Sequence, residues 1–224
     1  MEKTVYILRR SLHQILEILF PSRCIGCGAR SEMLCSNCVN NLKLTDRPTE
    51  DSIMALYDYR DPLIKKSVWE LKYHHSPHLG RKFGELLYES FLEEIELIKI
   101  LSKGLPIYII PIPISKNKYQ KRGYNQSEVI AKGFCNTKRD NTFELKTKVL
   151  YKKNNTIPQA RLTNRNKRLQ NIKDAFYIKD AKEIKGRTII VIDDVTTTGG
   201  TMLEAIKVLK KSGAKKVVGF AVAH

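Results

Sequence analysis

Apolar residues gather in runs along this chain, separated by polar stretches rich in glycine and proline. Continuous apolar runs at 105–115, 186–195 and 215–224 are typical of strands buried on both faces. Apolar positions at helical spacing lie between them, over 127–134 and 199–214. Strand, helix and strand in this order form a βαβ unit. We therefore expect an α/β fold with a largely parallel sheet flanked by helices.

Weaker patterns complete this outline. Asp61 followed by Pro62 is a typical helix start, and a second helix is predicted over 79–101. The alternating segment 142–150 predicts a further strand, at the sheet edge. Residues 40–56 are mostly polar, so we interpret them as a linker. The expected domains are then 1–50 and 51–224.

The first twenty residues show apolar side chains at helical spacing from Val5 to Leu19, interrupted by Arg9, Arg10 and Glu17. These charges interrupt the apolar stretch, so it fits neither the apolar core of a signal peptide nor a membrane span. We expect an amphipathic helix packed on a soluble, cytoplasmic protein. Docking of this helix on a membrane or a partner is the alternative.

Four cysteines follow in the stretch CIGCGARSEMLCSNC, as two Cys-x2-Cys pairs. The candidate ligands are Cys24, Cys27, Cys35 and Cys38. Two such turns facing each other present four thiolates, the ligand set of a tetrahedral structural zinc ion. Redox pairs or a disulfide are the alternative, although a thioredoxin-type motif has one pair. Four protein ligands leave Zn²⁺ no open position, which predicts a structural metal.

The charge of the chain predicts a polyanionic partner. The formal net charge is +17 over 224 residues, and residues 103–173 hold 17 Lys and Arg against 3 Asp and Glu. One surface is therefore expected to be strongly basic. Such a surface suits nucleic acid, an anionic membrane or a phosphorylated ligand.

The richest chemistry lies in VIDDVTTTGGT, residues 191–201. Ligands of parallel sheets bind beyond the carboxyl ends of the strands, and Asp193 and Asp194 lie at such an end. The helix that follows exposes amide groups to an anion, and Gly199 and Gly200 allow close approach. Carboxylates repel phosphate, so they must hold sugar hydroxyls or a metal, which points to a phosphorylated sugar. Helix capping alone would need fewer polar groups, and no Walker or dinucleotide-binding glycine pattern is present.

This stretch resembles the phosphoribosyl pyrophosphate (PRPP) signature of type I phosphoribosyltransferases. With the four cysteines, LKYH, PIPIS, KRGYNQSE, IPQARLTNRNKRLQNIKDAF and the last strand, nearly the whole chain resembles the ComF family. The resemblance implies a type I phosphoribosyltransferase-like fold with an amino-terminal zinc finger. It also implies a role in natural competence, in which transforming DNA enters the cytoplasm as single strands.

The resemblance also implies site residues. The aspartates would hold the ribose hydroxyls, residues 196–201 the 5-phosphate and residues 112–115 the pyrophosphate, while a mobile loop that includes Asn171 would close over the substrate. The residues expected at PRPP are Asp193, Asp194, Thr196, Thr197, Thr198, Gly199, Gly200, Thr201, Pro113, Ile114, Ser115, Gln159 and Arg168. Mg²⁺ would bridge pyrophosphate and ribose oxygens. Lys72, Arg122, Tyr124 and Asn125 match the family pattern, and basic groups among them would meet the pyrophosphate.

The basic span provides the sequence evidence for single-stranded DNA as a partner. Tyr119, Tyr124 and Tyr151 are interleaved with its charges and could stack on bases while Lys and Arg follow phosphates. The expected DNA-binding residues are Lys116, Lys118, Lys121, Arg122 and Lys138. The alternative is that the charge serves only PRPP and solubility. Other competence proteins at the inner face of the membrane are further partners that the family suggests.

The sequence supports two candidate functions and a weaker third. The first is a PRPP-binding, single-stranded-DNA-binding accessory protein of DNA uptake. The second is an active phosphoribosyltransferase that moves ribose-5-phosphate to an unidentified acceptor; the sequence offers no evident general base, so catalysis stays open. A PRPP-sensing regulator of transcription is the weaker third, because no helix-turn-helix pattern precedes the domain.

Overall fold

The computed structural model describes residues 22–30, 32–46, 52–74, 76–138, 141–153 and 174–224. The chain divides into two compact units, Met1–Leu42 and Lys43–His224. The helix expected over Val5–Leu19 and the loop residues Gln159, Arg168 and Asn171 lie outside the described residues. No helix in the described part of the chain is both long and apolar enough to cross a membrane.

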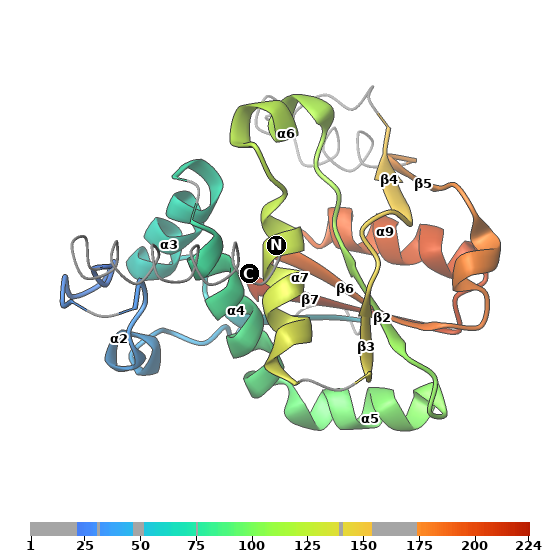
Figure 1. Ribbon diagram of the computed structural model, residues 1–224, viewed down its shortest axis with the longest axis horizontal. Helices are drawn as coiled ribbons and strands as arrows, with labels where there is room; N and C mark the ends of the chain where they lie inside the picture. Colours follow the sequence, from blue (N-terminus) through green and yellow to red (C-terminus); the bar gives the residue numbers. More distant parts are fainter. Residues whose placement is uncertain (1–21, 31, 47–51, 75, 139–140, 154–173) are drawn as a thin grey trace, which may run out of the picture. The chain divides into compact units, whose positions relative to one another are not determined.

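The second unit is built on a parallel sheet, which confirms the expected α/β fold. Its five strands in the described residues run in the order β1-β7-β6-β2-β3 (Figure 1). Their bounds are Ile53–Tyr57 for β1, Lys216–Ala223 for β7, Thr188–Val195 for β6, Ile107–Pro111 for β2 and Phe143–Leu145 for β3. Every pairing is parallel, so all carboxyl ends lie at one edge. The strands predicted around 105–115, 186–195 and 215–224 form its centre.

Helices cover both faces of this sheet. Successive residues of a strand point to opposite faces. On one face, Val191 of β6 packs with Met202 and Leu209 of α9 (Gly200–Lys211). On the other face, Phe220 of β7 contacts Phe134 of α7 (Gln126–Thr137). The core therefore lies in two layers, one on each side of β6 and β7.

The backbones of α4 (Pro77–Ser90) and α7 touch through glycines. A Cβ on Gly84 would lie 2.2 Å from the carbonyl oxygen of Ile130, and one on Gly133 would lie 2.3 Å from that of Arg81. Only glycine permits this approach, because interiors leave no room for an extra methyl group. The contact fixes α7 against the sheet and so positions the amino-terminal end of α7.

Three sequence predictions need correction or refinement. The helix predicted over 79–101 is two helices, α4 and α5 (Leu92–Ser102), which meet at Phe91. The presumed linker over 40–56 contains β1, an edge strand that places Ile53 in the core. The segment 142–150 gives β3 at the sheet edge, as expected. It then leads to β4 (Leu150–Lys152), which pairs antiparallel with β5 (Phe176–Ile178) in a separate sheet.

The remaining elements have local signals. Helix α3 (Pro62–Tyr73) begins as predicted, because the Asp61 carboxylate accepts hydrogen bonds from two amides of the first turn. The polar stretch after β2 forms α6 (Lys116–Arg122), which Ser115 caps at its start. Gly123, with a φ of 75°, ends it. A 3₁₀ turn spans Ala181–Ile184, and α2 spans Ser36–Asn40 in the first unit.

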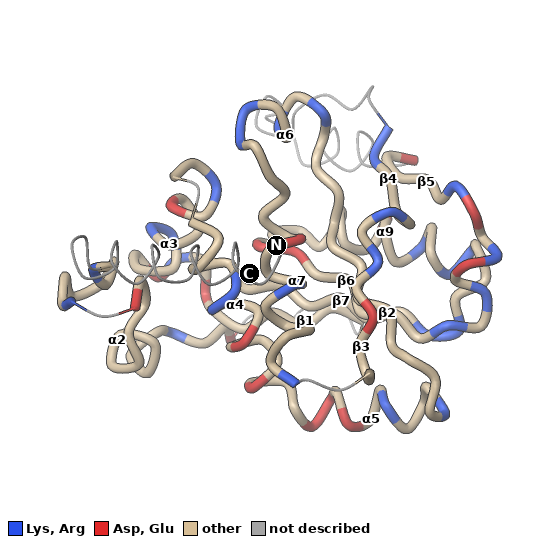
Figure 2. Tube along the Cα trace, in the orientation of Figure 1, with Lys and Arg blue, Asp and Glu red and all other residues tan. Residues whose placement is uncertain are grey.

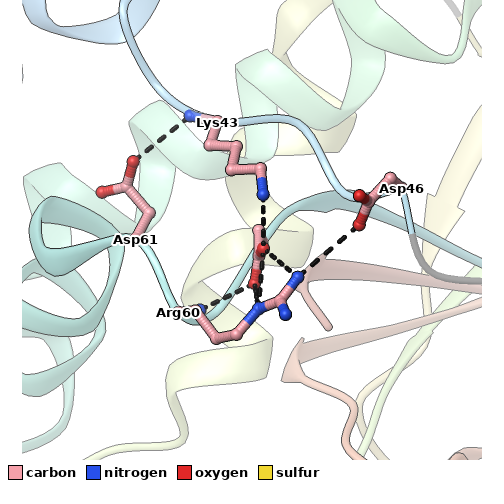
Figure 3. Close-up of polar contacts among 5 residues, drawn as sticks. Lys43, Asp46, Arg60 and Asp61 are labelled. Atoms are coloured by element: carbon pink, nitrogen blue, oxygen red, sulfur yellow. Dashed lines mark hydrogen bonds and ion pairs between the residues drawn. The ribbon is translucent and has the colours of Figure 1, made fainter.

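A buried carboxylate holds the start of the second unit to β1. Asp58 follows β1 and receives two-pronged hydrogen bonds from the Arg60 guanidinium, at 2.7–3.0 Å. Lys43 adds an ion pair at 3.4 Å, and Arg60 also contacts Asp46 at 3.6 Å (Figure 3). The hydrogen bonds from Arg60 keep the pKa of Asp58 far below its usual range.

Candidate ligand site and metal centre

Two adjacent carboxylates end the central strand β6. Asp193 and Asp194 are buried, with 8% and 5% of their surface exposed. An Asp193 oxygen accepts hydrogen bonds of 2.9 Å from the Ser127 hydroxyl and from the Asp194 amide. The Val195 amide donates to Asp194 at 2.9 Å. These donors hold the two carboxylates at the edge where ligands of parallel sheets bind.

Lys72, in the last turn of α3, neutralises one of the pair. Its ammonium group lies 2.9 Å from an Asp194 oxygen. Burial alone would raise the pKa of Asp194, but the charge and hydrogen bond of Lys72 outweigh it and lower that pKa. Burial likewise opposes the charge on Lys72, yet Asp194 raises the pKa of the lysine. Lys72 and Asp194 are therefore both charged.

Asp193 behaves differently. Burial, followed by the neighbouring Asp194 charge, raises the pKa of Asp193 to about 7. The Ser127 hydrogen bond opposes this shift without cancelling it. Near neutral pH, the pair thus holds one ionised carboxylate and one that exchanges its proton readily.

The loop after β6 leads into the amino terminus of α9. Gly199 precedes the helix with a φ of 73°, a conformation that glycine adopts without strain. Gly199 stands at the capping position and has no side chain that could cap the helix. The start of a helix offers amide donors that suit an anion, and Thr197 is exposed just before it. The His224 ring, at the end of β7, lies 2.7 Å from the Thr197 carbonyl oxygen.

Residues 112–115 continue from β2 beside this loop. The Ile112 amide donates to the Ile192 carbonyl at 2.9 Å, and the Asn125 side chain donates to the Ile112 carbonyl at 3.0 Å. Asn125 also caps α7, because its oxygen accepts from the Ser127 amide at 3.1 Å. A single residue thus connects the expected pyrophosphate loop to the helix that holds Asp193.

Two further lysines come close to the carboxylates. Partial loss of hydration beside other protein atoms lowers the pKa of Lys118 of α6, although its side chain is exposed, and that of the half-buried Lys152 of β4. Arg122 lowers the pKa of Lys118 further, and Lys118 lowers that of Lys152, while the carboxylates oppose both shifts. Lys118 and Lys152 therefore feel the charge of the site, while Lys72 of α3 is the lysine in contact with Asp194.

Most of the sequence-predicted residues in the described part meet at this edge. The aspartates end β6, residues 196–201 follow β6, residues 112–115 follow the neighbouring β2, and Lys72 reaches this edge from α3. Tyr124 donates its hydroxyl to the Leu71 carbonyl, which ties the end of α3 to the α6–α7 connection. Arg122 donates to Gln126 at 2.9 Å.

The residues expected at DNA are more dispersed. Lys116, Lys118, Lys121 and Arg122 share α6, but Lys138 follows the far end of α7. Helix α7 has twelve residues, so its two ends lie about 18 Å apart. Tyr119 is exposed on α6, whereas Tyr151 stacks on Tyr177 at 5.5 Å.

Sequence analysis missed Ser127, Lys152 and His224. No spacing rule relates Ser127 to a carboxylate 66 residues away, since only the packing of α7 brings them together. His224 becomes adjacent to the Thr197 loop because β7 pairs with β6 in register to its end.

The first unit holds the four-cysteine cluster. The sulfur atoms of Cys24, Cys27, Cys35 and Cys38 all lie within 4.8 Å of one another, so the cluster could hold a metal ion. The Cys27 and Cys35 sulfurs are 3.8 Å apart. Four sulfurs at about 2.3 Å from a tetrahedral Zn²⁺ would be separated by about 3.8 Å, so the donor set fits zinc.

The thiols are already polarised for binding a cation. Burial would raise the pKa of Cys24, but amide groups led by that of Cys35 lower it to about 6. The hydrogen bond to Cys24 in turn raises the pKa of Cys38 to about 12. Cys24 thus loses its proton far more readily than Cys38, and a bound cation would favour the thiolate form of both.

The central strand of the parallel sheet, its two buried carboxylates and the Gly-Thr loop all lie in one segment that is similar to a known family. Residues 120–224 match the family described as phosphoribosyl transferase domain.

Homology extends over most of the chain. The chain is 27% identical over 202 residues to Competence protein F of Haemophilus influenzae, and the match covers 90% of this chain and 84% of that protein. It is 24% identical over 228 residues to Competence protein ComFC of Bacillus subtilis, covering 99% and 84%. For DNA utilization protein YhgH of Escherichia coli K12, identity is 26% over 200 residues, covering 87% and 80%. The chain is a homologue of these competence and DNA utilization proteins.

One solved structure is also similar, the "Structure of the allosteric regulatory enzyme of purine biosynthesis". It matches with a TM-score of 0.40 and 16% identity, over 66% of this chain and 25% of that chain.

The carboxylate pair predicts how stability depends on pH. The pKa of Asp193 is raised in the folded protein, so the folded state holds a proton there that the unfolded state releases at lower pH. The stability that this proton contributes is complete below about pH 4 and is lost as the pH rises through about 7. Relative to Asp193→Asn, the wild type should lose about 1.4 kcal/mol of unfolding free energy per pH unit between these limits. Urea unfolding at a series of pH values measures this difference. Glu93→Gln, an exposed carboxylate on α5, is the control, and parallel profiles for wild type and Asp193→Asn would contradict the assignment.

Proposed function

We propose that this protein binds PRPP with Mg²⁺ at the Asp193–Asp194 site and binds single-stranded DNA, in support of DNA uptake. The similarity of the chain to competence and DNA utilization proteins supports the biological role. The observation that carries the ligand is the buried carboxylate pair, with Lys72 bound to Asp194, beside the glycine-led start of α9.

The site offers different binding partners to the ribose hydroxyls of PRPP and to its phosphate groups. Ribose hydroxyls donate hydrogen bonds, and Asp193 and Asp194 are acceptors at the sheet edge. The 5-phosphate fits the first amides of α9, where the helix dipole favours an anion. Lys72 and Lys118 supply positive charge for the pyrophosphate. Mg²⁺ would be held largely by oxygens of the ligand, as is usual for this ion with phosphates.

Phosphoribosyl transfer is the second candidate. The match of residues 120–224 to a transferase family favours it. Leaving-group charge would be stabilised by the same lysines. Release of pyrophosphate from PRPP on addition of single-stranded DNA would favour transfer, whereas binding without release would favour the accessory role.

The single-stranded DNA surface is proposed on α6. None of its residues is buried, and Lys116 and Lys121 are both exposed on it. Phosphate contacts from such side chains give binding that is insensitive to sequence and weakens with salt.

PRPP binding has a direct test in isothermal titration calorimetry with Mg²⁺. Each charged hydrogen bond is worth roughly 1.5–3 kcal/mol, so the double variant Asp193→Asn, Asp194→Asn should bind at least about 100-fold more weakly. Glu93→Gln should bind as the wild type does. Equal affinity of the double variant and the wild type would refute the site, and circular dichroism checks that both are folded.

The metal is proposed to be zinc. Protein purified without added zinc should contain about one equivalent per chain. Cys24→Ser should lose the ion and loosen the first unit while the sheet is retained, whereas Cys135→Ser, on α7, should keep it. Elemental analysis decides the matter: a metal-free, fully folded preparation would show that the four cysteines serve another purpose.

DNA binding should depend steeply on salt. Each phosphate contact contributes a log–log slope of about −0.7 on single strands, so Lys116→Ser with Lys121→Ser should flatten the slope by about 1.4. Affinity should fall alike on all sequences, and PRPP binding should survive. Lys138→Ser, at the far end of α7, is the matched control. A salt titration of a labelled oligonucleotide gives the answer, and wild-type protein without salt-sensitive binding would rule the DNA role out.

A further inference from the structure

Two large aromatic rings are exposed on one side of α3. Trp69 and Tyr73 are 49% and 62% exposed, one helical turn apart. Their ring centres lie 5.9 Å apart. The opposite side of the helix is buried through Ile64 and Leu71, so these two rings contribute to no part of the core. Exposed aromatic pairs of this kind point to a binding surface.

An arginine and a histidine border the two rings. The Arg122 guanidinium lies over the Tyr73 ring, 5.3 Å from its centre, and the His74 ring lies 4.4 Å from that of Trp69. Helix α3 also carries Lys65 and Lys66, and Figure 2 shows Lys and Arg on both α3 and α6. The acidic Glu70 is engaged with His74 at 3.7 Å. The rim of the aromatic pair is therefore basic rather than apolar.

We propose that Trp69 and Tyr73 form a platform on which bases of single-stranded DNA stack, while Arg122 and the lysines of α3 and α6 contact its phosphates. This inference rests on the proposed binding of single-stranded DNA and names the residues that hold the bases. Flat rings and fixed cations match the alternation of base and phosphate along a single strand. A protein partner would favour an apolar patch with fewer charges at its centre. Duplex DNA keeps its bases stacked inside and offers no such face.

The platform lies beside the carboxylate site. Lys72, between the two aromatic residues in sequence, points to Asp194, while Tyr124 binds the Leu71 carbonyl from the α6–α7 connection. A strand stacked on α3 would thus pass the place proposed for PRPP, and α6 provides phosphate contacts next to it.

The chain offers a built-in probe, because Trp69 is its single tryptophan. Titration of full-length protein with an oligothymidine should quench its fluorescence, with the same Kd as anisotropy of a labelled strand. Duplex of equal length should not quench it. Trp69→Ala and Tyr73→Ala should each weaken binding roughly 5- to 150-fold, as expected for loss of one base stack. Trp69→Phe should restore most of the affinity.

Stacking variants should leave the salt slope unchanged, since no phosphate contact is lost. Leu97→Ala is the matched control, as Leu97 is an equally exposed apolar side chain, at 63%, on α5. Wild-type affinity in both alanine variants, or a strand that binds without quenching, would overturn the platform and leave the DNA role intact. Self-association that Trp69→Ala abolishes, without quenching by DNA, would assign the surface to a second copy and also overturn it. No strand binding by the wild type would overturn the DNA role and the platform together.

Discussion

Two carboxylates buried side by side at the end of one strand repel each other, and both lose the stabilisation that water gives to charge. The second unit is arranged around this constraint. Lys72 reaches Asp194 from α3, and Ser127 reaches Asp193 from α7. Glycine contacts between α4 and α7 hold that second helix in place. Elements far apart in sequence are thus required to keep one charged and one readily protonated carboxylate at the sheet edge.

The same constraint gives the site its proposed selectivity. Carboxylates alone would reject a phosphorylated ligand, and lysines alone would accept any anion. Lys72 adds positive charge at the pair, and the start of α9 adds amide donors. A ligand that offers hydroxyl groups and phosphates a few ångströms apart satisfies both halves, which is the chemistry of PRPP.

Sequence alone predicted the features whose signals are local. Each of these signals lies within a few residues of sequence. They are the buried strands, the Asp61 cap, the Asp193–Asp194 stretch with its glycines and the two Cys-x2-Cys pairs. Strand β1 was missed because it is short and follows a polar stretch, and α6 because it has no apolar face. Ser127 and His224 join the site only through tertiary packing, so no local pattern could reveal them.

The central claim is that Asp193 and Asp194 receive the ribose of PRPP while the start of α9 receives its phosphate. A crystal structure of the protein with PRPP and Mg²⁺ tests this most directly. Ribose hydroxyls should lie within hydrogen-bond distance of both carboxylates, and the 5-phosphate should lie on the amides of residues 197–201. Lys72 should turn from Asp194 towards the pyrophosphate. PRPP bound elsewhere, with the Lys72–Asp194 ion pair intact and the carboxylates unliganded, would contradict it.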